Sequence, residues 1–263
     1  MRKTILAALI ILAAPLFAVE SLESLIARIA GEIDATVGVA ALHVESGRRV
    51  SLRGDEPFPM GSVNKLPIAI AFLRQVDLGK VSLSREVTIQ PAQFASGHSP
   101  LRDSARGKAV TLTLNRALDL MLGQSDSTAS DLLERLAGVE GVEDTTTPDA
   151  MLAVLERFYA RKDGLSKSSH DLAMKIMTRT PAGEHRIRAG APADASVAHK
   201  TGTTRGLLND VGIITSPNGK NHLLIAVFTK GGREATTTQR ERTISTITRE
   251  IYQGLIGTKT KTR

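Results

Sequence analysis

Ser62 and Lys65 are the first residues of this 263-residue chain whose types and spacing could do chemistry. They stand in Ser62-Val63-Asn64-Lys65, directly after a glycine-bearing turn and at the start of a helical pattern. Residues three apart share a helical face, so the Lys65 amine can reach the Ser62 hydroxyl. A neutral lysine can accept the serine proton, and N–H groups at a helix start can stabilise an oxyanion. The pair indicates a serine nucleophile with a lysine base, although an N-cap serine before an unrelated lysine gives the same pattern.

A second motif, Ser125-Asp126-Ser127, carries two hydroxyl groups. It follows a Gly-Gln break after an apolar stretch and precedes the helix expected from Thr128. The triplet can therefore present both hydroxyls from a loop between buried helices. Taken alone, it also fits simple helix capping.

The third motif, Lys200-Thr201-Gly202, ends a short expected strand. Its glycine stands where another backbone or a ligand would need close approach. Taken alone, it also fits an ordinary strand end followed by a turn.

The elements that must position these motifs alternate between strands at the two chain ends and helices in the middle. Helical periodicity covers 22–34, 63–78, 114–123, 128–137, 148–160, 170–178 and about 235–255. Strand-like runs cover 37–44, 50–52, 196–199, 207–215 and 222–229. We therefore predict an α+β fold, an α/β sandwich in which terminal helices flank an antiparallel sheet built from both chain ends. An all-helical subdomain is inserted into it.

The predicted boundaries follow from this order of elements. We expect one catalytic domain over 19–263. Its sheet subdomain covers about 22–61 and 190–263, and its helical subdomain covers about 62–189.

Composition narrows the function further. The chain has no cysteine, which excludes disulfides, thiolate metal sites and a cysteine nucleophile. A formal charge of +7 would suit a nucleic-acid partner, but aromatic residues make up 3% and the positive charges are scattered. We expect no nucleic-acid partner. The six histidines show no metal-binding spacing, so we expect no metal and no organic cofactor.

Residues 1–18 have the pattern of an export signal. Arg2 and Lys3 precede an apolar core over 5–17 that is too short to cross a bilayer comfortably. Cleavage after Ala18 would release a periplasmic or secreted protein, which we expect to be monomeric and free of the membrane. An uncleaved anchor is the alternative.

The order and context of the three motifs resemble the class A serine β-lactamases and the related penicillin-binding proteins. The resemblance extends over about residues 22–255. It includes the approach to the serine at 58–62 and three further segments at 144–148, 186–190 and 227–229. We identify the chain as a relative of the class A family, with a small-molecule β-lactam as substrate.

The resemblance implies catalytic roles for three side chains. Ser62 would be the nucleophile that opens the β-lactam ring, with Lys65 as its base or proton relay. Ser125 would pass a proton to the departing ring nitrogen. The backbone N–H groups of Ser62 and Thr203 would form the oxyanion hole.

The resemblance also implies a binding strand formed by Lys200, Thr201, Gly202 and Thr203. Lys200 would hold the substrate carboxylate and lower the pKa of Lys65, and Thr201 would hydrogen-bond the same carboxylate. Ser127 would contact the substrate amide.

Three residues depart from the family pattern or stay unassigned. Ser127 stands where the family usually has asparagine, and His98 stands where it commonly has an aromatic residue at the mouth of the site. Arg205 is available for the carboxylate, but the motif match assigns it no role.

A larger departure lies between Ser125 and Lys200, where the chain is roughly thirty residues shorter than the family pattern requires. In the family, the missing loop carries the glutamate that activates the deacylating water. Glu140 and Glu143 are the nearby carboxylates, but neither stands in a matching motif. We therefore interpret both as solvated turn residues.

Three hypotheses follow. The first is a serine β-lactamase that forms an acyl-enzyme on Ser62 and hydrolyses it slowly. The second is a penicillin-binding protein or D-alanyl-D-alanine peptidase, which uses the same motifs and is favoured by the missing loop. The third is a non-catalytic β-lactam-binding sensor, which is disfavoured because the sequence has no second apolar run of eighteen residues. Intact mass over time with a β-lactam separates them.

Overall fold

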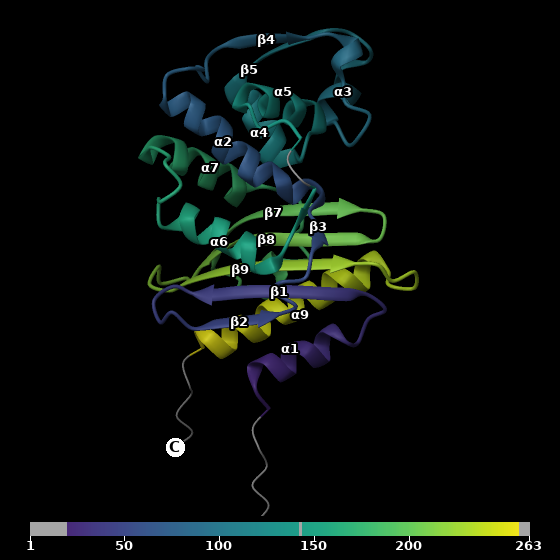
Figure 1. Ribbon diagram of the computed structural model, residues 1–263, viewed down its shortest axis with the longest axis vertical. Helices are drawn as coiled ribbons and strands as arrows, with labels where there is room; N and C mark the ends of the chain where they lie inside the picture. Colours follow the sequence, from purple (N-terminus) through teal and green to yellow (C-terminus); the bar gives the residue numbers. More distant parts are fainter. Residues whose placement is uncertain (1–19, 142–143, 258–263) are drawn as a thin grey trace, which may run out of the picture.

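A five-stranded antiparallel sheet forms the centre of the computed structural model, which describes residues 20–141 and 144–257. The strand order is β2-β1-β9-β8-β7 (Figure 1). The strands are β1 (Thr36–His43), β2 (Arg49–Leu52), β7 (Ser196–Thr204), β8 (Leu207–Thr215) and β9 (His222–Lys230). The long pairing of β1 with β9 joins the two chain ends, which confirms the predicted sheet.

One face of the sheet is covered by the two terminal helices, α1 (Leu22–Ala30) and α9 (Thr237–Leu255), which lie against each other (Figure 1). Alternate residues of β1, such as Val37 and Val39, point to this side and pack with Ile26 of α1. The next residues of the same strand belong to the core on the opposite face. β1 is therefore apolar along most of its length, as a strand buried on both faces must be.

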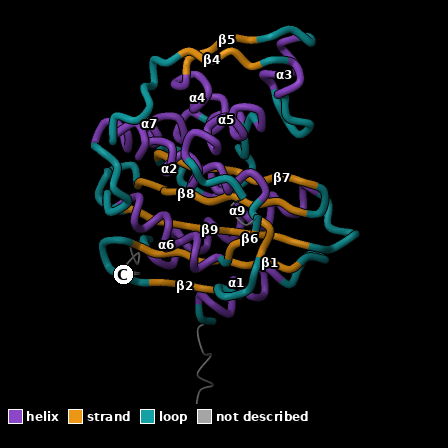
Figure 2. Tube along the Cα trace, turned by 45° about the horizontal axis from the view of Figure 1, so that its top comes forward, coloured by secondary structure: helices purple, strands orange, loops and turns teal. Residues whose placement is uncertain are grey.

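The middle of the chain folds as helices on the other face of the sheet (Figure 2). The longer ones are α2 (Lys65–Asp77), α4 (Leu114–Gln124), α5 (Ser127–Ala137), α6 (Pro148–Tyr159) and α7 (Lys167–Arg179), and each coincides with a predicted helix. The short α3 (Pro100–Ala105) also lies in this part, whereas α8 (Ile187–Gly190) packs on α9, with Ile187 in the core beneath the terminal helices. One hydrophobic core joins these helices to residues of the sheet such as Ala40 and Phe228. The boundary between sheet and helical subdomains stays a prediction.

The expectation of an all-helical insertion needs one correction. Strands β4 (Glu86–Ile89) and β5 (Val110–Thr113) pair as an antiparallel ribbon, seen at the top of Figure 1. Each has four residues and buries one of them, Ile89 or Leu112, so neither shows a clear alternation. A second ribbon pairs β3 (Phe58–Pro59) with β6 (Thr145–Thr146).

Residues 1–18, with the predicted export signal, lie outside the described residues. Within 20–141 and 144–257, no helix combines the length and the apolar character that a membrane crossing requires.

We predict that Gly38→Ala destabilises the protein. A Cβ at Gly38 would lie 2.5 Å from the Phe58 ring and 2.9 Å from Pro148, so the residues that lead to the first motif must shift. Overpacking of this kind costs about 1–3 kcal/mol, and thermal unfolding monitored by circular dichroism should show the loss. Gly31→Ala is the control, because its Cβ would meet nothing closer than 3.4 Å. Equal melting temperatures for both variants would contradict the prediction.

Candidate active site

Ser62 and Lys65 lie together at the start of α2. Residues Gly61–Asn64 form a 3-10 turn, and the α-helix follows from Lys65, so the predicted helix over 63–78 begins with a tighter turn. The Lys65 Nζ donates a hydrogen bond to the Ser62 Oγ at 2.9 Å. Gly61 enters the turn with φ +51°, a conformation that favours glycine. The first predicted pair is therefore formed.

Ser125 and Lys200 form a second serine–lysine pair. The Lys200 Nζ donates to the Ser125 Oγ at 2.9 Å and to the carbonyl oxygen of Thr201, also at 2.9 Å. Ser125 ends α4 in the left-handed conformation (φ 59°). Thus two motifs 75 residues apart in sequence meet through one ammonium group.

Burial shifts both amines toward neutrality. Lys65 is 5% exposed and Lys200 is 2% exposed. Burial lowers the pKa of Lys65 to about 8, against the opposing effect of Asp126 and Asp131. Burial also lowers the pKa of Lys200 to about 7, with a further contribution from the positive charge of Lys65. Near neutral pH, the two amines therefore need not both be positively charged.

Gly202 lets β7 pass close to the turn that carries Ser62. A Cβ there would lie 2.5 Å from the Met60 carbonyl oxygen and 3.4 Å from the Ser62 nitrogen. The Asn209 amide of β8 holds the same turn, because its Nδ2 donates to the carbonyl oxygens of Pro59 (2.8 Å) and Met60 (3.1 Å). The sheet and the nucleophile turn are thus fixed to each other.

The other residues named from sequence lie on β7, at the start of α5 and in the adjoining loops. Thr201 is 7% exposed on β7. Ser127 begins α5, and its N–H donates to the His98 carbonyl oxygen at 2.8 Å. The Nε2 of His98 lies 3.0 Å from the carbonyl oxygen of Gln124, so His98 packs on the loop that carries the second motif. Arg205 lies in the exposed turn between β7 and β8.

Asp126 joins several elements of the site through hydrogen bonds, whereas its sequence context indicated only possible helix capping. It is fully buried, and its carboxylate accepts hydrogen bonds from Ala129 N (2.9 Å), Leu101 N (2.7 Å) and Ser99 Oγ (3.1 Å to the nearer oxygen). These contacts fix Ser125 and Ser127, its neighbours in the chain, relative to α3. Its position between the two serines was the available sequence signal.

Arg186 was also missed as a site residue. Its buried guanidinium donates to the Thr203 Oγ1 at 2.9 Å and to the Asn209 carbonyl oxygen at 3.1 Å. Glu241 of α9 pairs with it at 3.4 Å. Arg186 therefore fixes the end of β7 through these hydrogen bonds. The only sequence signal for this role was its place in a segment similar to the family.

The connection from α5 to α6 is short. It runs from Gly138 to the β6 strand that pairs with β3, and the Met60 N–H donates to the Asp144 carbonyl oxygen at 2.6 Å. Glu140 is exposed in this connection, and Glu143 lies outside the described residues.

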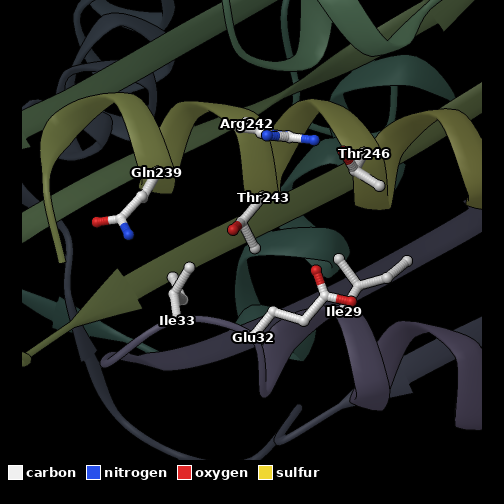
Figure 3. A pocket seen from close by; sticks show the side chains of 7 residues that line it. All are labelled: Ile29, Glu32, Ile33, Gln239, Arg242, Thr243 and Thr246. Carbon is white, nitrogen blue, oxygen red and sulfur yellow. The ribbon is translucent and has the colours of Figure 1, made fainter.

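A separate hollow lies between α1 and α9 (Figure 3). Its lining includes Glu32, Gln239 and Arg242, and none of the predicted site residues belongs to it. We therefore place no part of the chemistry there.

Comparison with known proteins identifies relatives along most of the chain. The model of a family described as "Beta-lactamase enzyme family" matches residues 21–145 and 136–255. β-Lactamase VEB-1 of Pseudomonas aeruginosa is 31% identical over 81% of this chain and 83% of its own length. The extended-spectrum β-lactamase PER-1 of the same organism is 30% identical over 83% and 82%.

Solved structures give the same result. A β-lactamase from Chitinophaga pinensis superposes with a TM-score of 0.81 at 35% identity, over 88% of this chain and 98% of that one. The TLA-1 extended-spectrum β-lactamase has a TM-score of 0.82 at 28% identity, over 89% and 98%.

The alignment with VEB-1 also bears on the short connection. It spans 252 positions but takes in 81% of a 263-residue chain. Several tens of the aligned positions are therefore gaps in this chain. The two overlapping family matches, which meet between 136 and 145, locate the interruption after α5.

We predict that the reactivity of Ser62 rises with pH. Lys65 accepts the serine proton only when neutral, so the rate of labelling by an uncharged phosphonylating reagent should rise through about pH 8 and level off above it. Stopped assays with mass detection of the labelled protein measure this rate. Lys65→Ala should remove the rise, and a level profile in the unaltered protein would contradict the assignment.

Proposed function

Because this chain belongs to the class A serine β-lactamases, we propose that Ser62 is the nucleophile that its β-lactam substrate acylates. The protein is a hydrolase that acts on β-lactams. The single observation that carries the residue assignment is the pair of serine–lysine contacts, Lys65 with Ser62 and Lys200 with Ser125, each at 2.9 Å. These contacts support Ser62 as the nucleophile and Ser125 as a proton carrier, because each hydroxyl lies beside an amine of lowered pKa.

In the proposed acylation step, neutral Lys65 takes the proton from the Ser62 Oγ as that oxygen attacks the ring carbonyl. The backbone N–H groups of Ser62 and Thr203 face the developing oxyanion, a role supported by the close approach of β7 at Gly202. As the carbon–nitrogen bond breaks, Ser125 donates a proton to the ring nitrogen. Ser125 is in turn reprotonated through the lysines.

Lys200 links substrate binding to this proton transfer. Its ammonium, with Thr201, is the proposed partner of the substrate carboxylate. A bound carboxylate favours the charged form of Lys200, and the repulsion between the two amines then favours neutral Lys65. Substrate binding would therefore put Lys65 in the state that acylation requires.

Deacylation is the proposed slow step. In the family, the loop that is shortened here supplies the glutamate that activates water. A positioned general base contributes about 10²–10⁴ in rate, so its loss should let the acyl-enzyme accumulate. A penicillin-binding protein-like acyl-enzyme former is the second candidate, and the same short connection favours it.

We further propose that the protein is exported, acts as a monomer in the periplasm or outside the cell, and works without a metal or organic cofactor. The support for export is the charged and apolar pattern of residues 1–18.

We predict a burst with a chromogenic cephalosporin. About one equivalent of the cephalosporin per protein should be opened rapidly, and slow steady turnover should follow. The reason is that acylation uses the intact motifs while deacylation lacks its usual base. Intact mass should show the adduct, and peptide mapping should place it on Ser62. Ser62→Ala should abolish both the burst and the adduct. Fast linear turnover without a burst would contradict slow deacylation, and an adduct on Ser125 would overturn the nucleophile.

We also predict that Lys200→Ala lowers kcat/KM for acylation by at least about tenfold, on the order of 1.4 kcal/mol. The variant loses both the cation for the carboxylate and its influence on Lys65. Lys220→Ala, in the exposed turn between β8 and β9, is the control for a simple change of net charge. Equal acylation rates for both variants with a carboxylate-bearing drug would exclude the proposed role.

A further inference from the structure

Asp131 is a carboxylate within electrostatic range of Lys65 that the proposed acylation step does not use. It lies on α5, one turn after Ser127, and α5 packs against α2, the helix that begins with Lys65. Its neighbours Leu132 and Leu133 are buried in the core between the helices, whereas Asp131 itself is exposed. The helix register therefore brings a solvent-accessible carboxylate to the Lys65 side of the site.

The two groups influence each other electrostatically. Partial burial raises the pKa of Asp131, whereas Arg135 and Lys65 act in the opposite direction. In return, Asp131 is one of two carboxylates that act on Lys65 to raise its pKa. Asp131 is thus exposed to water and lies within electrostatic range of a nearly buried amine that is hydrogen-bonded to the Ser62 Oγ.

The second carboxylate near Lys65 cannot take a further part. Asp126 is fully buried, and its oxygens already accept hydrogen bonds from two backbone N–H groups and from Ser99. For Asp131, the described residues provide no hydrogen bond and no ion pair. Glu140, one of the two glutamates of the shortened segment, lies in the exposed connection beyond the end of α5.

We propose that Asp131 is the general base for the residual hydrolysis of the acyl-enzyme, a proposal that rests on acylation at Ser62. A water held between Asp131 and the ester gives a proton to the carboxylate, and its oxygen forms a bond to the acyl carbon. The bond from that carbon to the Ser62 Oγ then breaks. The proton on Asp131 passes to Lys65, which acylation left neutral, and from Lys65 to the serine oxygen, so that both side chains return to their starting states.

The test compares Asp131→Asn with Glu140→Gln, which removes the same charge from the exposed connection. Each protein is acylated with a penicillin and freed of excess drug, and the decay of the adduct is followed by intact mass. A stopped-flow burst gives the acylation rate separately. We expect Asp131→Asn to slow the decay by about 10²–10⁴-fold with little change in acylation, and Glu140→Gln to leave both rates unchanged. Asp131→Glu should restore part of the decay rate.

Each other outcome overturns the proposal. Equal slowing of acylation and decay in Asp131→Asn would mean that Asp131 acts only through Lys65. Slow decay in Glu140→Gln alone would move the base to Glu140. An unchanged decay in Asp131→Asn would exclude Asp131, whereas the absence of both adduct and turnover in the unaltered protein would instead refute acylation at Ser62.

The unaltered protein offers a measurement that needs no variant. The rate at which the acyl-enzyme decays should rise with pH as Asp131 loses its proton, and then level off. The charged groups that act on Asp131 during this titration are Lys65, Arg135 and Asp126. A decay rate that does not rise with pH below neutrality would overturn the proposal.

Discussion

Two lysine side chains are buried within each other's electrostatic field, and the rest of the site depends on this arrangement. Burial of an amine disfavours its charged form, and a second amine nearby disfavours it further. The structure accepts this unfavourable arrangement where each ammonium meets a serine hydroxyl, Lys65 at Ser62 and Lys200 at Ser125. The same desolvation that costs stability brings both pKa values close to neutral pH, where an amine can exchange protons.

This arrangement requires three separate elements to meet with little freedom. The turn before α2 carries one serine, the end of α4 carries the other, and β7 carries Lys200. Asn209 ties the turn to the sheet through Pro59 and Met60, and Asp126 ties the α4–α5 junction to α3. Both ties are buried polar groups with their hydrogen bonds satisfied, which fix positions more sharply than apolar packing. The catalytic geometry therefore depends on residues that never meet the substrate.

Much of this could be predicted from sequence, and the remainder has identifiable causes. The sheet strands and long helices were predicted because their periodicity is strong, and the Ser62–Lys65 pair because its spacing and the motif order agree. The contact of Lys200 with Ser125 was not predicted, since the two residues are 75 positions apart in the sequence. The ribbon of β4 and β5 was missed, since strands of four residues with one buried side chain each give little signal. The roles of Arg186 and Asp131 depend on which elements pack together. Arg186 reaches β7 from the segment before α8. Asp131 comes within electrostatic range of Lys65 because α5 packs against α2, so spacing alone could not reveal either role.

The short connection after α5 affects acylation and deacylation differently, although both half-reactions use the same nucleophile. Every group proposed for acylation lies on α2 or the turn before it, on the α4–α5 junction or on β7, and all three regions remain anchored to the common core. In the family, the base for deacylation lies in the loop that is shortened in this chain. The base that we propose for the residual hydrolysis comes instead from an element that already serves acylation. That element is α5, whose first turn positions Ser127 and whose second turn carries Asp131, within electrostatic range of Lys65. Hydrolysis by such a base is constrained by the field of the lysine pair, so the two half-reactions cannot be tuned independently.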